Sequence, residues 1–177
     1  HLRDRMGTDD GGIAWVFVGS SLGYIVGSSL AGRLLGRGRH LVTAESCTGG
    51  WVAKACTDRP GSSRWFRGGA VVYTDELKTA MLGVQPRTLA EAGAVSQATV
   101  REMAAGALEH LGGDVAVAVS GIAGPDGGTP AKPVGTVWLA WAVRSRAGTV
   151  TRAQLHRFEG DREQVRRQAH AHAEGQA

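Results

Sequence analysis

The chain has 177 residues, 42% of them hydrophobic, which predicts one folded domain with a buried core and excludes a disordered chain. Its formal net charge of +4 is modest and no dense Lys/Arg tract occurs, so the charge fits a phosphate-bearing small molecule as well as a nucleic acid. The few aromatic residues do not interleave with basic ones, so we do not expect a nucleic-acid partner. Cys47 and Cys56 match no zinc or redox spacing and indicate a reducing, cytoplasmic location.

Residues 1–27 are interpreted as an amino-terminal extension, followed by a folded domain over residues 28–177. Residues 11–31 carry no charge and are long enough to suggest a membrane span. However, this stretch is rich in Gly and Ser, and Asp9 and Asp10 stand where a signal peptide would carry basic residues. We therefore expect a packed element or an extension there, and no membrane segment.

The first half of the domain alternates between short helix and strand signals, with Gly and Pro marking the ends. In chain order we expect a helix from Ser28 or Ser29 to Gly36, a strand over 40–44, a helix through Val52 that ends near Arg59, a strand over 65–74, a helix over 76–82 and another after Pro86.

The second half carries the most regular helix signal of the chain. Ser96 has the character of an N-cap, and the apolar residues behind it recur at helical spacing. These residues are Val100, Met103, Ala104, Ala107, Leu108 and Leu111. Asp161 and Gln164 form a capping-box pattern that predicts a last helix from Arg162 to about Ala173.

Three strands are expected between these two helices. Residues 114–120 alternate Val with Ala, so both faces are apolar, as in a central strand covered on both sides. Residues 134–143 and 150–158 are adjacent strand signals that suggest a hairpin, and hence a mixed sheet. Strands alternating with helices argue for a layered α/β domain.

The segment Glu45-Ser46-Cys47-Thr48-Gly49-Gly50 lies at a predicted junction of strand and helix. A helix start offers unpaired N–H groups and a positive dipole end, and glycines let a ligand approach the backbone. Ser46 can present its hydroxyl there while neighbouring N–H groups stabilise an oxyanion. The alternative is a structural N-cap with glycines that serve packing.

Tyr73 and Lys78 form a second candidate pair, one at the end of a strand and the other on the next helix. Lysine can activate a serine, but it must first lose its proton, which near neutral pH requires burial or a nearby cation. The alternative is a solvated Lys78 that pairs with Asp75 or Glu76.

A glycine-rich loop over residues 120–129 follows the buried strand predicted over 114–120. It lies at the carboxyl end of that strand, where ligands bind in open α/β sheets. Its many N–H groups suit a phosphate or carboxylate, and it matches neither a Walker loop nor a dinucleotide motif. The candidate binding residues are Ser120, Gly121, Gly124, Gly127, Gly128, Thr129 and Lys132. The alternative is a mobile surface loop without a ligand.

The last predicted helix carries Arg162, Arg166 and Arg167, of which the first two share a face. They can reach an anion or form a solvated face, and the sequence favours the solvated face. The histidines show no metal-binding spacing, so no metal site is expected.

Residues 43–78 and 119–140 closely resemble the CinA carboxy-terminal domain family, the nicotinamide-nucleotide amidohydrolases. Residues 83–96 and 160–169 are similar to the same family in the same order, and the resemblance covers about residues 30 to 173. The resemblance implies a three-layer α/β/α domain. Together with the strand pattern, it predicts that the sheet of this domain is mixed and largely parallel.

The resemblance also implies a reaction, the deamidation of nicotinamide mononucleotide to nicotinate mononucleotide and ammonia. Ser46 would be the nucleophile and Tyr73 and Lys78 the activating residues. The amides around Cys47, Thr48, Gly49 and Gly50 would hold the oxyanion, and segment 120–136 would form part of the pocket. No metal or organic cofactor is implied, and a homo-oligomer is expected.

This chain departs from the family at Thr74 and Asp75, where the family usually has Ser and Asn. Two other functions stay open at this point. One is a nucleotide-binding module without turnover, and the other is an accessory domain in competence or DNA damage.

Overall fold

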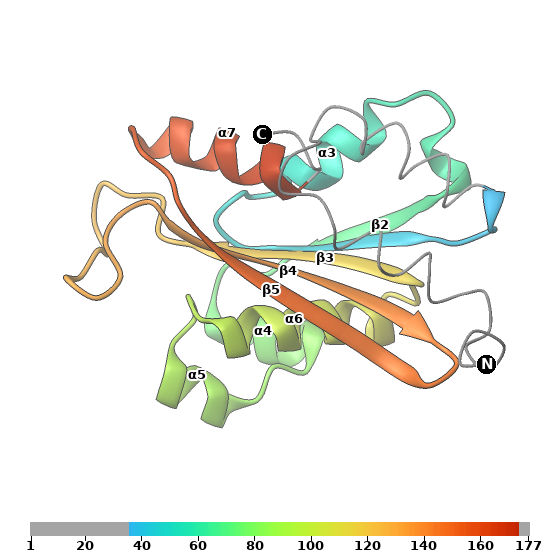
Figure 1. Ribbon diagram of the computed structural model, residues 1–177, viewed down its shortest axis with the longest axis horizontal. Coiled ribbons are helices and arrows are strands. Elements are labelled where there is room, and N and C mark those ends of the chain that lie inside the picture. Colours follow the sequence, from blue (N-terminus) through green and yellow to red (C-terminus); the bar gives the residue numbers. More distant parts are fainter. Residues whose placement is uncertain (1–35, 174–177) are drawn as a thin grey trace, which may run out of the picture.

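The computed structural model describes residues 36–173, so the extension expected over 1–27 and the helix expected from Ser28 lie outside the described residues, apart from the end of that helix at Gly36. A five-stranded sheet in the order β2-β1-β3-β4-β5 forms the middle layer (Figure 1). Its strands are β1 (Leu41–Glu45), β2 (Phe66–Val71), β3 (Val115–Gly121), β4 (Thr136–Ser145) and β5 (Gly148–Arg157).

Helices cover both faces of this sheet, as Figure 1 shows. One face packs against α3 (Trp51–Thr57) and α7 (Arg162–Ala173). The other packs against α4 (Asp75–Leu82) and α6 (Gln97–His110), with α5 (Pro86–Ala92) beside them. The short 3-10 helix η1 (Ser62–Arg64) precedes β2 and contacts α3. Two separate apolar cores result, one on each face. The expected three-layer α/β/α class is confirmed.

The strand pairings make the sheet mixed, as expected. β1 pairs in parallel with β2 on one side and β3 on the other. β3 pairs antiparallel with β4, and β4 with β5 in a long hairpin. Parallel and antiparallel pairs are therefore equal in number rather than mostly parallel, because the hairpin adds two antiparallel pairs to the parallel half of the sheet.

Alternation along the strands assigns each side chain to one core. Val42 and Ala44 of β1 belong to the α4–α6 core, and Ala116 and Ala118 of β3 lie beside them. The intervening side chains, such as Val117, belong to the α3–α7 core. Small alanines on one side of β1 and β3 let α6 approach the sheet closely.

The expected caps are present. The Ser96 hydroxyl accepts from the Thr99 N–H at 3.1 Å and begins α6. Asp161 and Gln164 form a capping box before α7, with each side chain accepting from the other's N–H at 2.9 and 2.8 Å.

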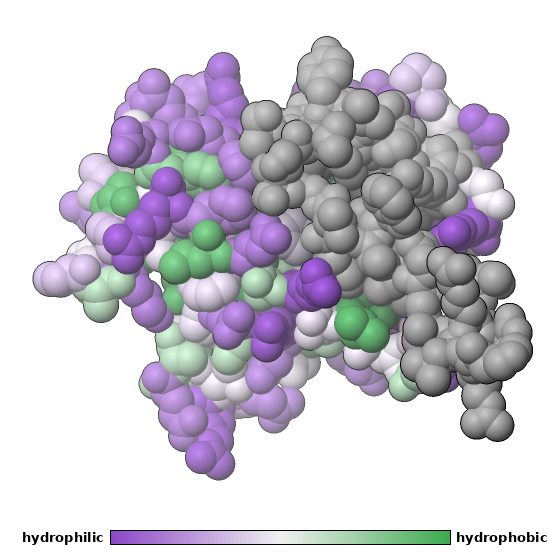
Figure 2. Space-filling view, in the orientation of Figure 1, coloured by the Kyte–Doolittle hydropathy of each residue, from purple (hydrophilic) through white to green (hydrophobic). Residues whose placement is uncertain are grey.

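Strand β2 is shorter than the expected 65–74 because Thr74 already serves as the N-cap of α4, accepting from the Leu77 N–H at 3.3 Å. The surface in the view of Figure 2 is mainly hydrophilic, with small separate apolar spots on the described part. None of the described helices is both long and apolar enough to cross a membrane.

Candidate active site

Glu45 is the last residue of β1, and its carboxylate caps the following helix from inside the protein. The side chain is 1% exposed and accepts from the Gly50, Val52 and Ala53 N–H groups at 2.8–3.1 Å. It also accepts from the Thr48 hydroxyl at 2.7 Å. The amino end of α3 is therefore held by Glu45, and the alternative that Ser46 is a plain N-cap is wrong.

Ser46 continues β1 by one residue and leaves its hydroxyl free of partners in the described part of the chain. Its N–H donates to the Val119 carbonyl at 3.0 Å, so the β1–β3 ladder reaches this position. Alternation after Val42 and Ala44 places the Ser46 side chain on the α4–α6 face of the sheet. The residue is 7% exposed, and no group within residues 36–173 hydrogen-bonds its Oγ.

Cys47 is the adjacent nucleophile, and its environment makes it unreactive. The thiol packs in the α3–α7 core, where burial raises its pKa to about 12. A cysteine reacts as the thiolate, and this thiol stays protonated near neutral pH. Ser46 is therefore the better nucleophile of the two.

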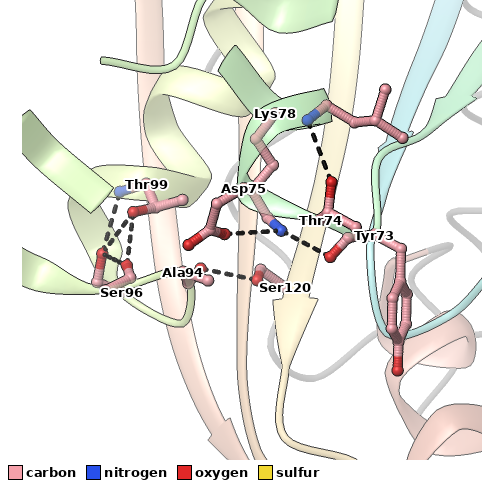
Figure 3. Close-up of polar contacts among 10 residues, drawn as sticks. Tyr73, Thr74, Asp75, Lys78, Ala94, Ser96, Thr99 and Ser120 are labelled. Carbon is pink, nitrogen blue, oxygen red and sulfur yellow. Dashed lines mark hydrogen bonds and ion pairs between the residues drawn. The ribbon is translucent and has the colours of Figure 1, made fainter. Parts of the chain in front are cut away.

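Lys78 is buried on the same face of the sheet. Its side chain is 1% exposed, and its amine donates to the Tyr73 carbonyl oxygen at 3.1 Å. The Asp75 carboxylate lies 3.4 Å from the amine, and Figure 3 shows the amine between these two oxygens. The alternative of a solvated lysine is wrong, although the pairing with Asp75 is present.

Tyr73 contacts Lys78 through its backbone, and its ring points elsewhere. The side chain is 58% exposed, and its hydroxyl accepts from Arg162 at 3.2 Å. In Figure 3 the ring extends away from the Lys78 amine. Arg162 thus ties the phenol to α7.

Ser120, the residue before the end of β3, lies beside Ser46, because the register pairs Glu45 with Val119. Its hydroxyl donates to the Ala94 carbonyl oxygen at 2.8 Å, which ties β3 to the turn between α5 and α6. Lys132 donates to the Ala92 carbonyl oxygen at 2.8 Å and anchors the glycine-rich loop to the same turn. Ser120 and Lys132 thus both hold this turn, which sequence reasoning did not identify.

The other candidate residues of the glycine-rich loop differ in their packing and exposure. Gly121 packs closely on β4, since a Cβ there would lie 2.6 Å from the Val137 side chain. Gly127, Gly128 and Thr129 are exposed, and Thr129 closes a tight turn by accepting from the Lys132 N–H at 3.0 Å. Their contacts with a ligand stay a prediction.

Two arginines of α7 bind backbone carbonyls of the site, so a purely solvated face is wrong for them. Arg162 donates to the Gly124 carbonyl oxygen at 2.7 Å. Arg166 donates to the carbonyls of Cys47 and Thr48 at 2.9 and 3.1 Å. Only Arg167 of the three keeps to the surface, where it pairs with Glu163 at 2.9 Å.

Sequence reasoning missed the role of Glu45 and the partners of the arginines. The signal for Glu45 was a carboxylate at a strand end a few residues before a helix start. Nothing local could reveal that Arg166 contacts residues 119 positions away.

Another cavity lies on the outer side of α7, about 560 Å³ in volume and lined by Glu159, Gly160, Gln164, Arg167 and Gln168. Neither Ser46 nor Lys78 lines it. Across residues 36–173, no three His, Cys, Asp or Glu side chains gather as a metal site would require.

A family model for the CinA C-terminal domain matches residues 25–174. The chain belongs to the CinA C-terminal domain family. Its expected family resemblance is thereby confirmed, and the motifs around Ser46, Lys78 and the glycine-rich loop all lie within the matched region.

Several relatives in the CinA C-terminal domain family are named for an activity. A protein of Escherichia coli named nicotinamide-nucleotide amidohydrolase PncC is 56% identical over 140 residues, covering 79% of this chain and 83% of the relative. A protein of the same name from Pseudomonas putida is 53% identical over 148 residues, covering 80% and 88%.

The fold of the CinA C-terminal domain is also known from solved structures. The competence damage-inducible protein A of Klebsiella pneumoniae superposes with a TM-score of 0.78 at 42% identity, covering 84% of this chain and 90% of that one. This similarity agrees with the α/β/α architecture described above.

Proposed function

We propose that this chain deamidates nicotinamide mononucleotide to nicotinate mononucleotide and ammonia. The observation that carries the proposal is that two buried groups, Ser46 and Lys78, both belong to the α4–α6 face of the sheet. Ser46 directly follows β1, and no group within residues 36–173 hydrogen-bonds its hydroxyl, while the buried amine of Lys78 donates to the Tyr73 carbonyl oxygen. The names of the relatives, nicotinamide-nucleotide amidohydrolase, support the choice of substrate.

In this mechanism, Ser46 Oγ attacks the carboxamide carbon and Lys78 accepts the hydroxyl proton. The C–N bond then breaks, and the departing amide nitrogen takes that proton to leave as ammonia. Water hydrolyses the resulting ester, which restores Ser46 and releases the carboxylate product. General base catalysis of this kind typically supplies about 10²- to 10⁴-fold.

Lys78 must lose its proton before it can act as this base. The amine is buried, and the Asp75 carboxylate lies 3.4 Å from it. The pyridinium ring of the substrate is itself a cation, so in this proposal it competes with the Lys78 amine for the Asp75 carboxylate.

Tyr73 and the glycine-rich loop belong to the binding side of the proposal. The Tyr73 hydroxyl and the Gly124 carbonyl are both held by Arg162. In this proposal the phenol relays the proton to the departing ammonia. The exposed N–H groups of Gly127 and Gly128, with Lys132 behind them, would contact the phosphate.

Ser46→Ala tests the nucleophile. Ammonia release from nicotinamide mononucleotide should be abolished, because no other reactive hydroxyl continues β1, and the melting temperature should not change. Ser63→Ala, at an exposed serine of η1, is the matched control and should keep full activity. Full activity of Ser46→Ala would refute the mechanism.

The substrate choice is tested in the same assay with free nicotinamide beside the mononucleotide. A preference for the phosphorylated compound is expected. Tight binding of the mononucleotide without ammonia release would instead support the module without turnover. DNA affinity that weakens steeply with salt would support the accessory-domain alternative. The cytoplasmic location and the homo-oligomer stay predictions.

A further inference from the structure

Arg166 of α7 hydrogen-bonds the carbonyl groups of two successive peptides in the loop that follows Ser46. Its Nε donates to the Cys47 carbonyl at 2.9 Å and one terminal nitrogen donates to the Thr48 carbonyl at 3.1 Å. The guanidinium carbon also lies 4.6 Å from the centre of the Trp51 ring, so the plane is supported from a third side. The guanidinium is thereby fixed in position and orientation.

Gly49 makes this approach possible. It has a φ of 62°, and a Cβ there would come within 3.2 Å of the Arg166 guanidinium. Arg162, one turn earlier on the same face, holds the Gly124 carbonyl. Helix α7 therefore presents a fixed pair of cations to the two loops that flank Ser46.

The hydrogen bonds from Arg166 to these carbonyls also determine where the N–H groups of the same peptides point. The peptide bonds on both sides of Thr48 are trans, so each C=O and the N–H that follows it point in opposite directions. Because Arg166 draws the Cys47 carbonyl toward α7, the Thr48 N–H must face away from α7.

Within residues 36–173, the Cys47 and Thr48 N–H groups are both without an acceptor, and of the two the Thr48 N–H belongs to the peptide whose carbonyl Arg166 holds. The next amide, Gly49, donates to the Ser46 carbonyl at 3.1 Å, and Gly50 donates to Glu45 at 3.0 Å. A backbone N–H held in a fixed direction close to the nucleophile in sequence is the kind of donor that stabilises an oxyanion.

We propose that Arg166 is a positioning residue, which fixes the Cys47–Thr48 peptide so that its N–H stabilises the oxyanion formed by attack of Ser46. The inference rests on the proposed amidase function and deepens it. Arg166 does not touch the substrate. It acts through the peptide that it holds, so its loss should affect the transition state far more than the bound substrate.

Arg166→Ala tests this inference, with Arg167→Ala as the matched control one residue away on the same helix. Loss of one oxyanion donor lowers kcat by about 10²- to 10³-fold. Because the peptide in Arg166→Ala is loosened but not removed, we expect kcat to fall by about 10²-fold, with a nearly unchanged KM for nicotinamide mononucleotide. Arg167→Ala should match the wild type in kcat.

Chemical rescue separates positioning from a general loss of structure. Millimolar guanidinium chloride should restore part of kcat in Arg166→Ala and have no such effect on Arg167→Ala. Arg166→Lys keeps the charge but can serve only one carbonyl, so its kcat should lie between those of wild type and Arg166→Ala. If Arg166→Ala fails to fold, Arg166→Lys carries the test by its ratio of kcat to KM.

Two results would contradict a positioning role of Arg166. A kcat near wild type in Arg166→Ala, or a loss of kcat that guanidinium does not restore and that follows a lower melting temperature, would overturn the inference. Failure of the proposed function looks different, because the wild type and Arg167→Ala would then release no ammonia either, and the inference would fall with it.

Discussion

At the scale of single residues, Ser46 and Cys47 show how burial selects between two neighbouring nucleophiles. Successive strand residues point to opposite faces, so the hydroxyl and the thiol enter different environments. The hydroxyl lies on the α4–α6 face of the sheet, whereas the thiol enters the α3–α7 core and has its pKa raised to about 12. One residue of register thus separates a reactive group from an inert one.

Cys47→Ala should therefore leave ammonia release close to the wild-type rate. The free energy of unfolding should fall by about 1 kcal/mol, because a buried sulfur leaves a small cavity. Steady-state kinetics and urea unfolding measure the two effects. A loss of activity as large as that of Ser46→Ala would show that the thiol takes part in the chemistry.

Lys78 shows that the tertiary environment determines whether a lysine is a solvated charge or a buried amine. The sequence left open a solvated lysine and a buried base, and the side chain proves to be 1% exposed. Burying an amine is costly unless polar groups surround it, and Asp75 and the Tyr73 carbonyl supply that surrounding. If Lys78 is the base, Lys78→Met should be nearly inactive in the ammonia assay, and a mild effect would place the base elsewhere.

At the scale of elements, the crossing of α4 and α6 depends on one glycine. A Cβ on Gly106 would collide with the Leu82 carbonyl, so the two helices pack backbone to backbone at this point. Leu82 is the last residue of α4, and α4 carries Lys78. The position of the candidate base is thus linked to a close helix contact.

Gly106→Ala should destabilise the protein even though alanine is the better helix former. Helix propensity favours alanine by up to about 1 kcal/mol, while overpacking of a fixed contact costs about 1–3 kcal/mol. Gly36→Ala, where a Cβ would meet no atom of the described residues within 4 Å, is the control. A melting temperature of Gly106→Ala above that of the wild type would contradict the close contact.

At the scale of the whole molecule, the sheet order brings the candidate site together. The carboxyl ends of β2, β1 and β3 lie side by side, because all three strands are parallel neighbours. Lys78 follows the first of these strands, Ser46 the second, and the glycine-rich loop the third. Helix α7, from the end of the chain, then closes one side through its arginines.

The same packing makes stability depend on pH through His156. Its ring stacks on Phe158 and lies 4.7 Å from the His172 ring, between β5 and α7. Desolvation, and then the nearby His172, lower the pKa of His156 from its usual 6.5. The unfolded chain therefore binds a proton at a higher pH than the folded one, so stability is lost as pH falls below about 6.5.

His156→Gln should reduce this loss. The wild type should show a larger drop in melting temperature between pH 7.5 and 5.5 than the variant, when both are measured in the same buffers. His110→Gln, at an exposed position at the carboxyl end of α6, serves as the control and should follow the wild type. Parallel curves for the wild type and His156→Gln would show that this ring does not control the pH response.

Much of the fold followed from local pattern. The apolar stripe behind Ser96 predicted α6, and the alternating residues before Ser120 predicted the central β3. The capping box at Asp161 predicted the start of α7. These signals involve contacts within about one turn of helix or one face of a strand, which neighbouring residues determine among themselves.

The sequence by itself thus determined the elements, the family and the set of candidate residues, because each depends on neighbours along the chain. Tertiary structure decided that Lys78 is buried, that Lys132 holds the α5–α6 turn, and that Arg166 binds the loop after Ser46. These contacts join segments far apart in sequence, and they form only when the helices on both faces of the sheet have packed. No local periodicity encodes which carbonyl a distant cation will meet.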